Sequence, residues 1–147
     1  MTQIATIGFT KKSAEHFFGL LRSAGVRTLV DVRLKNKSQL AGFAQGRDLP
    51  FFLRELVGAS YIHEPLLAPT AEILDAYRNA SDWETYEVAF GALLEQPERR
   101  AALTRLVELE SPVCLLCSEH EPDFCHRRLV AERLEATGAS VDIVHLT

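Results

Sequence analysis

The chain has 147 residues, a formal net charge of −4 near neutral pH, and 47% hydrophobic and 24% charged residues. This length and composition are typical of one soluble globular domain spanning residues 1–147. No apolar run approaches the roughly 20 residues that span a bilayer, and the first residues lack the pattern of a signal peptide, so we expect no membrane partner. The acidic balance argues against a protein that coats nucleic acid through bulk charge, although it leaves room for a local basic site.

The cysteine content bears on the cellular compartment. Three cysteines are an odd number in a chain long enough to form a proper core. This argues against a disulfide framework and favours a reducing, cytoplasmic location.

The N-terminal third has the pattern of a strand, a helix and a second strand. Residues 4–8 form a short apolar run that ends in glycine, and residues 26–32 form a second run rich in β-branched side chains. Between them, Ser13 is a suitable N-cap, and apolar residues then recur at helical spacing until Gly25, a typical helix stop. The three segments have the size of a βαβ unit with parallel strands.

The remaining chain continues to alternate. Residues 34–48 show no clear period and are expected to form a long loop. Further strands are predicted at residues 60–63, 112–117 and 141–146, with helices at 50–57, 71–77, 86–94, 97–109 and, capped by Asp123, up to residue 136. This alternation predicts an α/β fold, a three-layer sandwich around a mostly parallel sheet of about five strands with helices on both faces.

Polar and reactive side chains follow the ends of several predicted strands. Ligands of open parallel sheets bind beyond the carboxyl ends of the strands, so these side chains are expected to share one edge. The residues are Asp31 and Arg33 after the second strand, His63 after the third, and Cys117, Glu119 and the Cys125-His126-Arg127 turn after the fourth.

Anion binding is one chemistry that this edge favours. A helix that begins near Asp123 presents free N–H groups and the positive end of its dipole. Arg33 and Arg127 can add bidentate donors for a phosphate or carboxylate. A solvated surface charge is an equally good interpretation of Arg127, and the better one for Arg128.

Cysteine chemistry is the second. Cys125 near a helix N-terminus, with Arg127 and His126 beside it, has the setting of a nucleophilic thiolate, and Cys117 can share that setting in space. The alternative is that both are small buried hydrophobic residues, which is the preferred interpretation of Cys114. Glu119 is a candidate general acid or base, or a partner that holds Arg127.

Metal binding is the third. Cys117, Cys125 and His126, with His120 or His63, offer zinc ligands, but the Cys-x7-Cys-His spacing differs from that of zinc knuckles and argues against zinc. His126 also falls on an apolar helical face, where its ring would lie against the sheet with one nitrogen bonded to backbone.

Aromatic residues and absent motifs narrow the ligand classes. Tyr61, Trp83 and Tyr86 can line a pocket for a planar ligand, although the spacing of Tyr86 favours the core. The chain has no Gly-x-Gly-x-x-Gly, Walker A, Gly-x-Ser-x-Gly or His-Glu-x-x-His motif, which argues against dinucleotide-binding, NTP-hydrolysing, serine-hydrolase and zincin activities.

These motifs together resemble the DUF488 domain family over nearly the whole chain. The resemblance rests on Thr6-Ile7-Gly8, on Asp31-Val32-Arg33 with Ser38, Phe43 and Tyr61 downstream, on Cys117-x-Glu119, on Cys125-His126-Arg127, and on the final Val144-His145-Leu146. It implies an α/β fold with a shared polar cleft that includes Ser38 and Tyr61, and it implies no particular reaction.

Three hypotheses follow. The first is an enzyme or enzyme-like binder of an anionic, phosphate- or nucleotide-like ligand, in which Arg33 and Arg127 hold the anion, Asp31 and Glu119 orient them or move protons, and Cys117 or Cys125 is reactive. The second is a non-catalytic module for nucleic acid or another ligand. It would use a local basic rim made of Lys11, Lys12, Arg33, Lys35, Lys37 and Arg47. The third is a structural ion-pair network without a ligand.

Overall fold

The computed structural model describes residues 2–37, 41–119 and 123–147. Within them, five parallel strands form a single sheet of order β3-β2-β4-β1-β5. The strands are β1 (Thr2–Gly8), β2 (Thr28–Asp31), β3 (Ser60–His63), β4 (Val113–Cys117) and β5 (Val141–Leu146). Because β4 pairs with both β1 and β2, Gly8 lies opposite Cys117 and Asp31 opposite Leu116.

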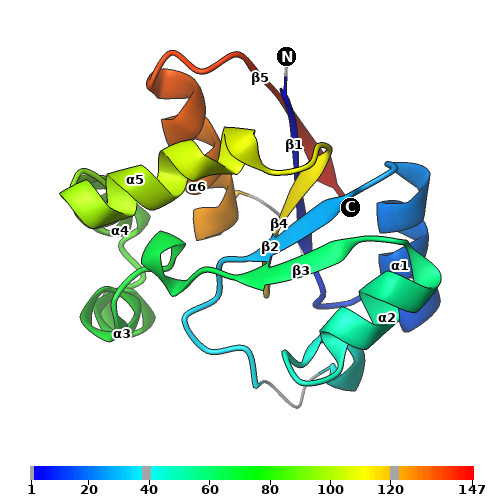
Figure 1. The fold of residues 1–147 in the computed structure, drawn as a ribbon. Helices are drawn as coiled ribbons and strands as arrows, with labels where there is room; N and C mark the ends of the chain where they lie inside the picture. The colour runs from blue at the N-terminus through cyan, green and yellow to red at the C-terminus, as the bar shows by residue number, and fades with distance from the viewer. Residues whose placement is uncertain (1, 38–40, 120–122) are drawn as a thin grey trace.

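Helices cover both faces of this sheet (Figure 1). One face carries α1 (Ala14–Ser23) and α2 (Leu49–Leu56). The other carries α3 (Ala71–Ala80), α4 (Trp83–Leu94), α5 (Pro97–Arg105) and α6 (His126–Ala136). Short 3-10 turns are η1 (Gly42–Ala44), η2 (Pro65–Leu67) and η3 (Leu106–Glu108). The predicted α/β three-layer sandwich is therefore confirmed.

The two faces have separate hydrophobic cores because successive strand residues point to opposite sides. In β4, Cys114 and Leu116 pack against α1 and α2, whereas Val113, Leu115 and Cys117 pack on the other side. This alternation places Cys117 on the same face as α6, whose N-terminus carries Cys125 and His126.

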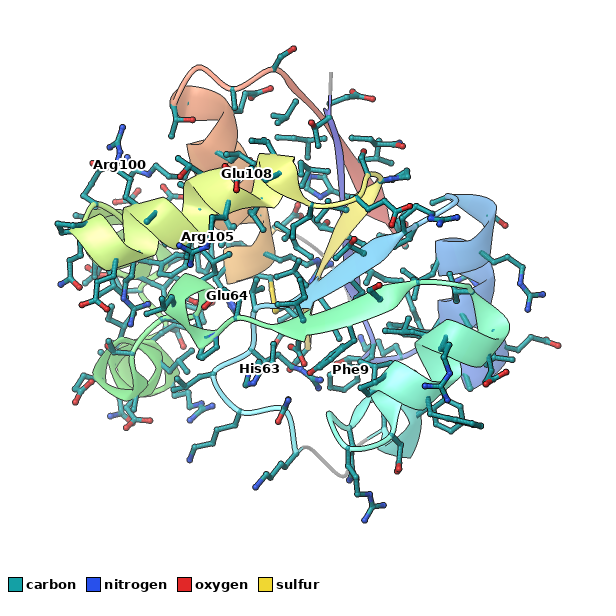
Figure 2. All side chains as sticks on the ribbon, viewed as in Figure 1. Phe9, His63, Glu64, Arg100, Arg105 and Glu108 are labelled. Atoms are coloured by element: carbon teal, nitrogen blue, oxygen red, sulfur yellow. A yellow bond between two sulfur atoms is a disulfide. The ribbon has the colours of Figure 1, made fainter. Side chains whose placement is uncertain are left out.

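Several local signals are confirmed. The Ser13 side chain accepts a hydrogen bond from the backbone N–H of His16, and Gly25 has φ of 67° where α1 stops. Both ends of α1 therefore agree with the sequence pattern. A further polar contact lies beyond β3, where Arg105 of α5 is 3.8 Å from the Glu64 carboxylate (Figure 2).

Other local predictions are wrong. Asp123 does not cap the last helix: α6 begins at His126 with Cys125 at the N-cap position. Residues 123–124 form a turn instead, in which the Asp123 carbonyl accepts a hydrogen bond from Arg128 Nη2 at 3.0 Å. The helix expected at residues 97–109 ends as an α-helix at Arg105 and tightens into η3. The first two strands are parallel as expected, and β4 lies between them in a strand order that the sequence did not predict.

Gly8 allows the chain after β4 to cross the end of β1. A Cβ atom at this position would collide with the backbone carbonyl of Glu119 and would lie 3.1 Å from Arg127 Nη1. Thr10 also holds this crossing, because its backbone N–H donates to the Ser118 carbonyl at 3.1 Å.

In the described part of the chain, no helix is both long and apolar enough to cross a membrane.

We expect Gly8→Ala to lower the free energy of unfolding by about 1–3 kcal/mol, because the backbone at Glu119 must shift to admit the methyl group. Urea denaturation measures this loss. The matched control is Gly19→Ala in α1, where nothing lies within 4 Å of the added Cβ. Helix propensity predicts that this control gains stability by roughly 0.5–1 kcal/mol, so equal effects of the two variants would contradict the crowding at Gly8.

Candidate functional site

A buried ion pair joins Asp31, the last residue of β2, to Arg33. Arg33 Nε donates to Asp31 Oδ1 at 2.8 Å and Nη2 donates to Oδ2 at 2.7 Å, with side chains 3% and 0% exposed. Tyr61 in β3 donates its hydroxyl to Asp31 Oδ2 at 2.6 Å. Burial, followed by this hydrogen bond, raises the pKa of Tyr61 above its usual value. The phenol therefore remains protonated and continues to donate to the carboxylate.

Two further contacts hold the Arg33 guanidinium in place. Nη2 also donates to the Ala44 carbonyl at 2.6 Å, and the Phe9 ring lies with its centroid 5.2 Å from the guanidinium carbon. The remaining nitrogen, Nη1, is buried and has no hydrogen-bond partner among the described residues. Because a buried donor without a partner is costly, this N–H group is suited to a ligand.

Two histidines hold the backbone that carries the ion pair. His126 Nε2 donates to the Val32 carbonyl at 2.6 Å, and His63 Nε2 donates to the Arg33 carbonyl at 2.8 Å. In the view of Figure 2, the side chains of His63 and Phe9 both lie below the ribbon of β3. Burial lowers the pKa of His126 to about 4, so its ring is neutral near neutral pH.

A disulfide joins Cys117, at the end of β4, to Cys125, at the N-cap of α6. The odd cysteine count argued against disulfides, and this bond corrects that expectation. His126 Nδ1 lies 3.8 Å from Cys117 Sγ. Cys114 is the free cysteine, fully buried in β4, and burial raises the pKa of its thiol, in agreement with its predicted place in the core.

A pocket of about 400 Å³ opens where β2, β4 and α6 meet α3 and α4. Charged side chains on its wall are Arg33, Lys35, Asp75, Arg78 and Glu119. Cys117, Cys125 and His126 also line it, and an aromatic group made of Tyr77, Trp83, Tyr86 and Phe124 completes it. One wall is thus polar and sulfur-bearing and the other is flat and aromatic.

The aromatic side chains of the pocket pack against one another. Trp83 and Tyr86 stack with centroids 4.7 Å apart and planes 17° apart, and Phe124 meets Trp83 edge-on at 5.5 Å. Phe124 is 61% exposed, although it is a large hydrophobic side chain. Burial raises the pKa of Tyr86, and the neighbouring Tyr77 and Glu119 add to this shift.

The predicted site residues other than His63 and Arg127 fall into three groups. Arg33, Cys117, Glu119, Cys125 and His126 line the pocket together. Asp31 and Tyr61 lie behind that wall, where they hold Arg33. Ser38 and His120 lie outside the described residues.

Arg127 is fully buried and is not a surface charge. Its Nη1 donates to the Glu119 carbonyl at 2.6 Å, directly over Gly8. The interpretation as a solvated charge is therefore wrong. The contact supports the loop that carries Glu119, and Arg127 is not among the residues that line the pocket.

Sequence patterns missed the α3 side of the pocket. Besides Tyr77, its members share one helical face at i, i+3, i+4 and i+7: Ala71, Leu74, Asp75 and Arg78. No residue of α3 is fully buried, and in the sequence a partly exposed face of this kind looks the same as an ordinary solvent-facing helix surface. The one sequence feature that could have indicated this wall is the presence of charged residues and Leu74 on a single helical face.

The chain belongs to the DUF488 family: the family model, described as a domain of unknown function, matches residues 13–134. The resemblance to this family is thereby confirmed. Comparisons with curated proteins and with solved structures found no match.

We expect Asp31→Ala to lower the free energy of unfolding by about 3–5 kcal/mol, because it leaves the Arg33 cation buried without its counterion. Thermal or urea denaturation measures the change. Asp75→Ala is the matched control, since the Asp75–Arg78 pair spans 3.4 Å on the surface with both side chains more than 60% exposed. Such pairs contribute about 0–1 kcal/mol. A similar small effect for both variants would contradict a structural role for the Asp31–Arg33 pair.

Proposed function

We propose that this protein is an enzyme, or an enzyme-like binder, that takes an anionic, nucleotide-like small molecule into the pocket at the carboxyl edge of the sheet. The observation that carries the proposal is Arg33 Nη1: Arg33 lines this pocket, and its buried Nη1 has no hydrogen-bond partner among the described residues. A phosphate or carboxylate oxygen would supply the missing acceptor.

The charge of the pocket supports an anion of modest charge. Asp31 already neutralises Arg33, so Arg33 contributes a fixed donor more than a free positive charge. Lys35 and Arg78 add exposed cations, whereas Asp75 and Glu119 add carboxylates. A ligand with one phosphate and several hydroxyl groups fits this mixture, because a carboxylate such as Glu119 can accept hydrogen bonds from ribose hydroxyls.

The aromatic wall supports a planar group at the other end of the ligand. Bases stack on aromatic side chains with about 1–3 kcal/mol per base, largely regardless of sequence. Trp83 is partly exposed and already stacked on Tyr86, and Phe124 stands exposed beside it. A base inserted between Trp83 and Phe124 would bury apolar surface on both rings.

The catalytic roles remain part of this proposal. Cys117 or Cys125, once reduced, would be the reactive thiol, with Glu119 as the acid or base and Asp31 as the group that orients Arg33. Arg127 would act indirectly, through the Glu119 backbone. The proposal includes a cytoplasmic location, because a reducing compartment would keep Cys117 and Cys125 as thiols.

The alternative of a nucleic-acid module has less support. Of the basic rim, Arg33 pairs with Asp31, Arg47 pairs with Asp48 at 3.1 Å, and Lys12 is 8% exposed. Neutralised and buried cations contribute little to binding of a phosphate backbone. A small ligand therefore fits the pocket better than a polymer.

Calorimetric titration with AMP, GMP, CMP and UMP, and with adenosine and inorganic phosphate, tests the proposal. We expect at least one mononucleotide to bind more tightly than phosphate. Trp83→Ala should weaken that binding about tenfold or more, because it removes the stacking surface. Phe51→Ala is the matched control, an exposed aromatic residue on α2 at the opposite face of the sheet.

Arg33→Lys separates the anion from the base. It keeps a cation beside Asp31 but removes Nη1, so binding of AMP should fall more than binding of adenosine. No heat with any mononucleotide, or wild-type affinity in Trp83→Ala, would contradict the proposal. Equal losses for AMP and adenosine in a folded Arg33→Lys protein would contradict the role of Arg33.

A further inference from the structure

We propose that the reduced protein binds a thiophilic divalent cation, zinc above all, through Cys117, Cys125 and His126. The Sγ atoms of the two cysteines and a ring nitrogen of His126 lie within 4.8 Å of one another, and all three side chains are buried. This proposal is independent of the nucleotide-like ligand, although both concern the same pocket.

The orientation of His126 suits a metal ligand. Its Nε2 is committed to the Val32 carbonyl, which can only accept a hydrogen bond, so the proton is on Nε2. Nδ1 therefore presents a lone pair, and it lies 3.8 Å from Cys117 Sγ. Metal-ligating histidines almost always donate their other N–H to a carbonyl or carboxylate in this way, because the contact fixes the ring orientation.

The two sulfurs come from elements that converge. Cys117 ends β4, and Cys125 occupies the N-cap position of α6, where the helix dipole favours a negatively charged ligand atom. Their Cα atoms lie 7.3 Å apart, beyond the roughly 4.4–6.8 Å of most disulfides. The backbone therefore leaves room for the sulfurs to separate around an ion.

The expected site is of the open kind. Two cysteines and one histidine supply three of the four ligands of a tetrahedral zinc ion, a set found in catalytic zinc sites, and the fourth position is left to water or substrate. All three residues line the pocket, so this position would face it. Two thiolates and a divalent cation are neutral together, which suits a buried site.

Binding requires reduction, because the structure joins the two sulfurs. A phosphine transfers two electrons to the disulfide and takes an oxygen atom from water, which gives a phosphine oxide and two thiols. Zinc then displaces the two thiol protons as it forms two metal–sulfur bonds. The site is thus present in the dithiol protein and absent from the disulfide protein.

Titration with Co²⁺, which reports thiolate ligation by its absorption, tests the proposal. The full chain is reduced with a phosphine, desalted without oxygen, and titrated; an oxidised sample is titrated in parallel. We expect the reduced protein to take up one equivalent of Co²⁺ with sulfur-to-cobalt charge-transfer and tetrahedral visible bands, which zinc then abolishes. The oxidised protein should show neither band.

Variants assign the ligands. Cys117→Ser, Cys125→Ser and His126→Ala should each lose about tenfold or more in Co²⁺ affinity, whereas Cys114→Ser, a buried cysteine on the other face of β4, should bind as the wild type does. Absence of cobalt bands in the reduced wild type would overturn the proposal, and so would unchanged affinity in the Cys117 and Cys125 variants. The redox comparison needs no substitution, so it remains decisive if a variant fails to fold.

The two proposals can fail separately. Trp83→Ala should retain Co²⁺ binding while it loses affinity for mononucleotides, because Trp83 is not one of the three metal ligands. Absence of nucleotide binding together with intact cobalt bands would contradict only the proposed nucleotide-like ligand. Nucleotide binding without cobalt bands would contradict only the metal site.

Discussion

The site depends on the buried ion pair between Asp31 and Arg33. Burial of two charges is costly unless geometry and additional hydrogen bonds compensate, and here Asp31 receives two guanidinium N–H groups, the Arg33 backbone N–H and the Tyr61 hydroxyl. Such a pair is weak grounds for high stability. Its consequence is positional: the guanidinium is fixed by Asp31, Ala44 and Phe9, and its remaining nitrogen, Nη1, is the donor that we propose for the ligand.

The parallel sheet explains how residues far apart in the chain come together. β2 and β4 are neighbours, so the segment after Asp31 and the end of β4 at Cys117 share one edge. His126, at the start of the helix that follows β4, then connects the two, with Nε2 on the Val32 carbonyl and Nδ1 toward Cys117. Gly8 leaves space for the chain after β4 to cross β1, and Arg127 holds that chain by donating a hydrogen bond to the Glu119 carbonyl. Ion pair, disulfide and histidine therefore form one connected structure.

Much of this edge was predictable, and the reasons are local. Asp31, Arg33, Cys117 and Glu119 directly follow apolar runs, and in a parallel sheet that position alone brings them to a common edge. The order of the strands was not predictable, because insertion of β4 between β1 and β2 depends on long-range pairing. The burial of Arg127 depends on a loop crossing that no periodicity reports, and the N-cap at Cys125 depends on the turn at Asp123. The α3 wall was missed because α3 has no fully buried residue.

Nitrogen-15 NMR of the arginine side chains during titration with the tightest-binding mononucleotide tests the central claim most directly. If Arg33 Nη1 receives the anion, the Arg33 guanidinium signals will shift and their hydrogen exchange will slow as the pocket fills. Arg47, exposed and paired with Asp48, serves as the internal reference and should not change. Saturation with ligand while the Arg33 signals remain unchanged would contradict the assignment of this pocket to an anion.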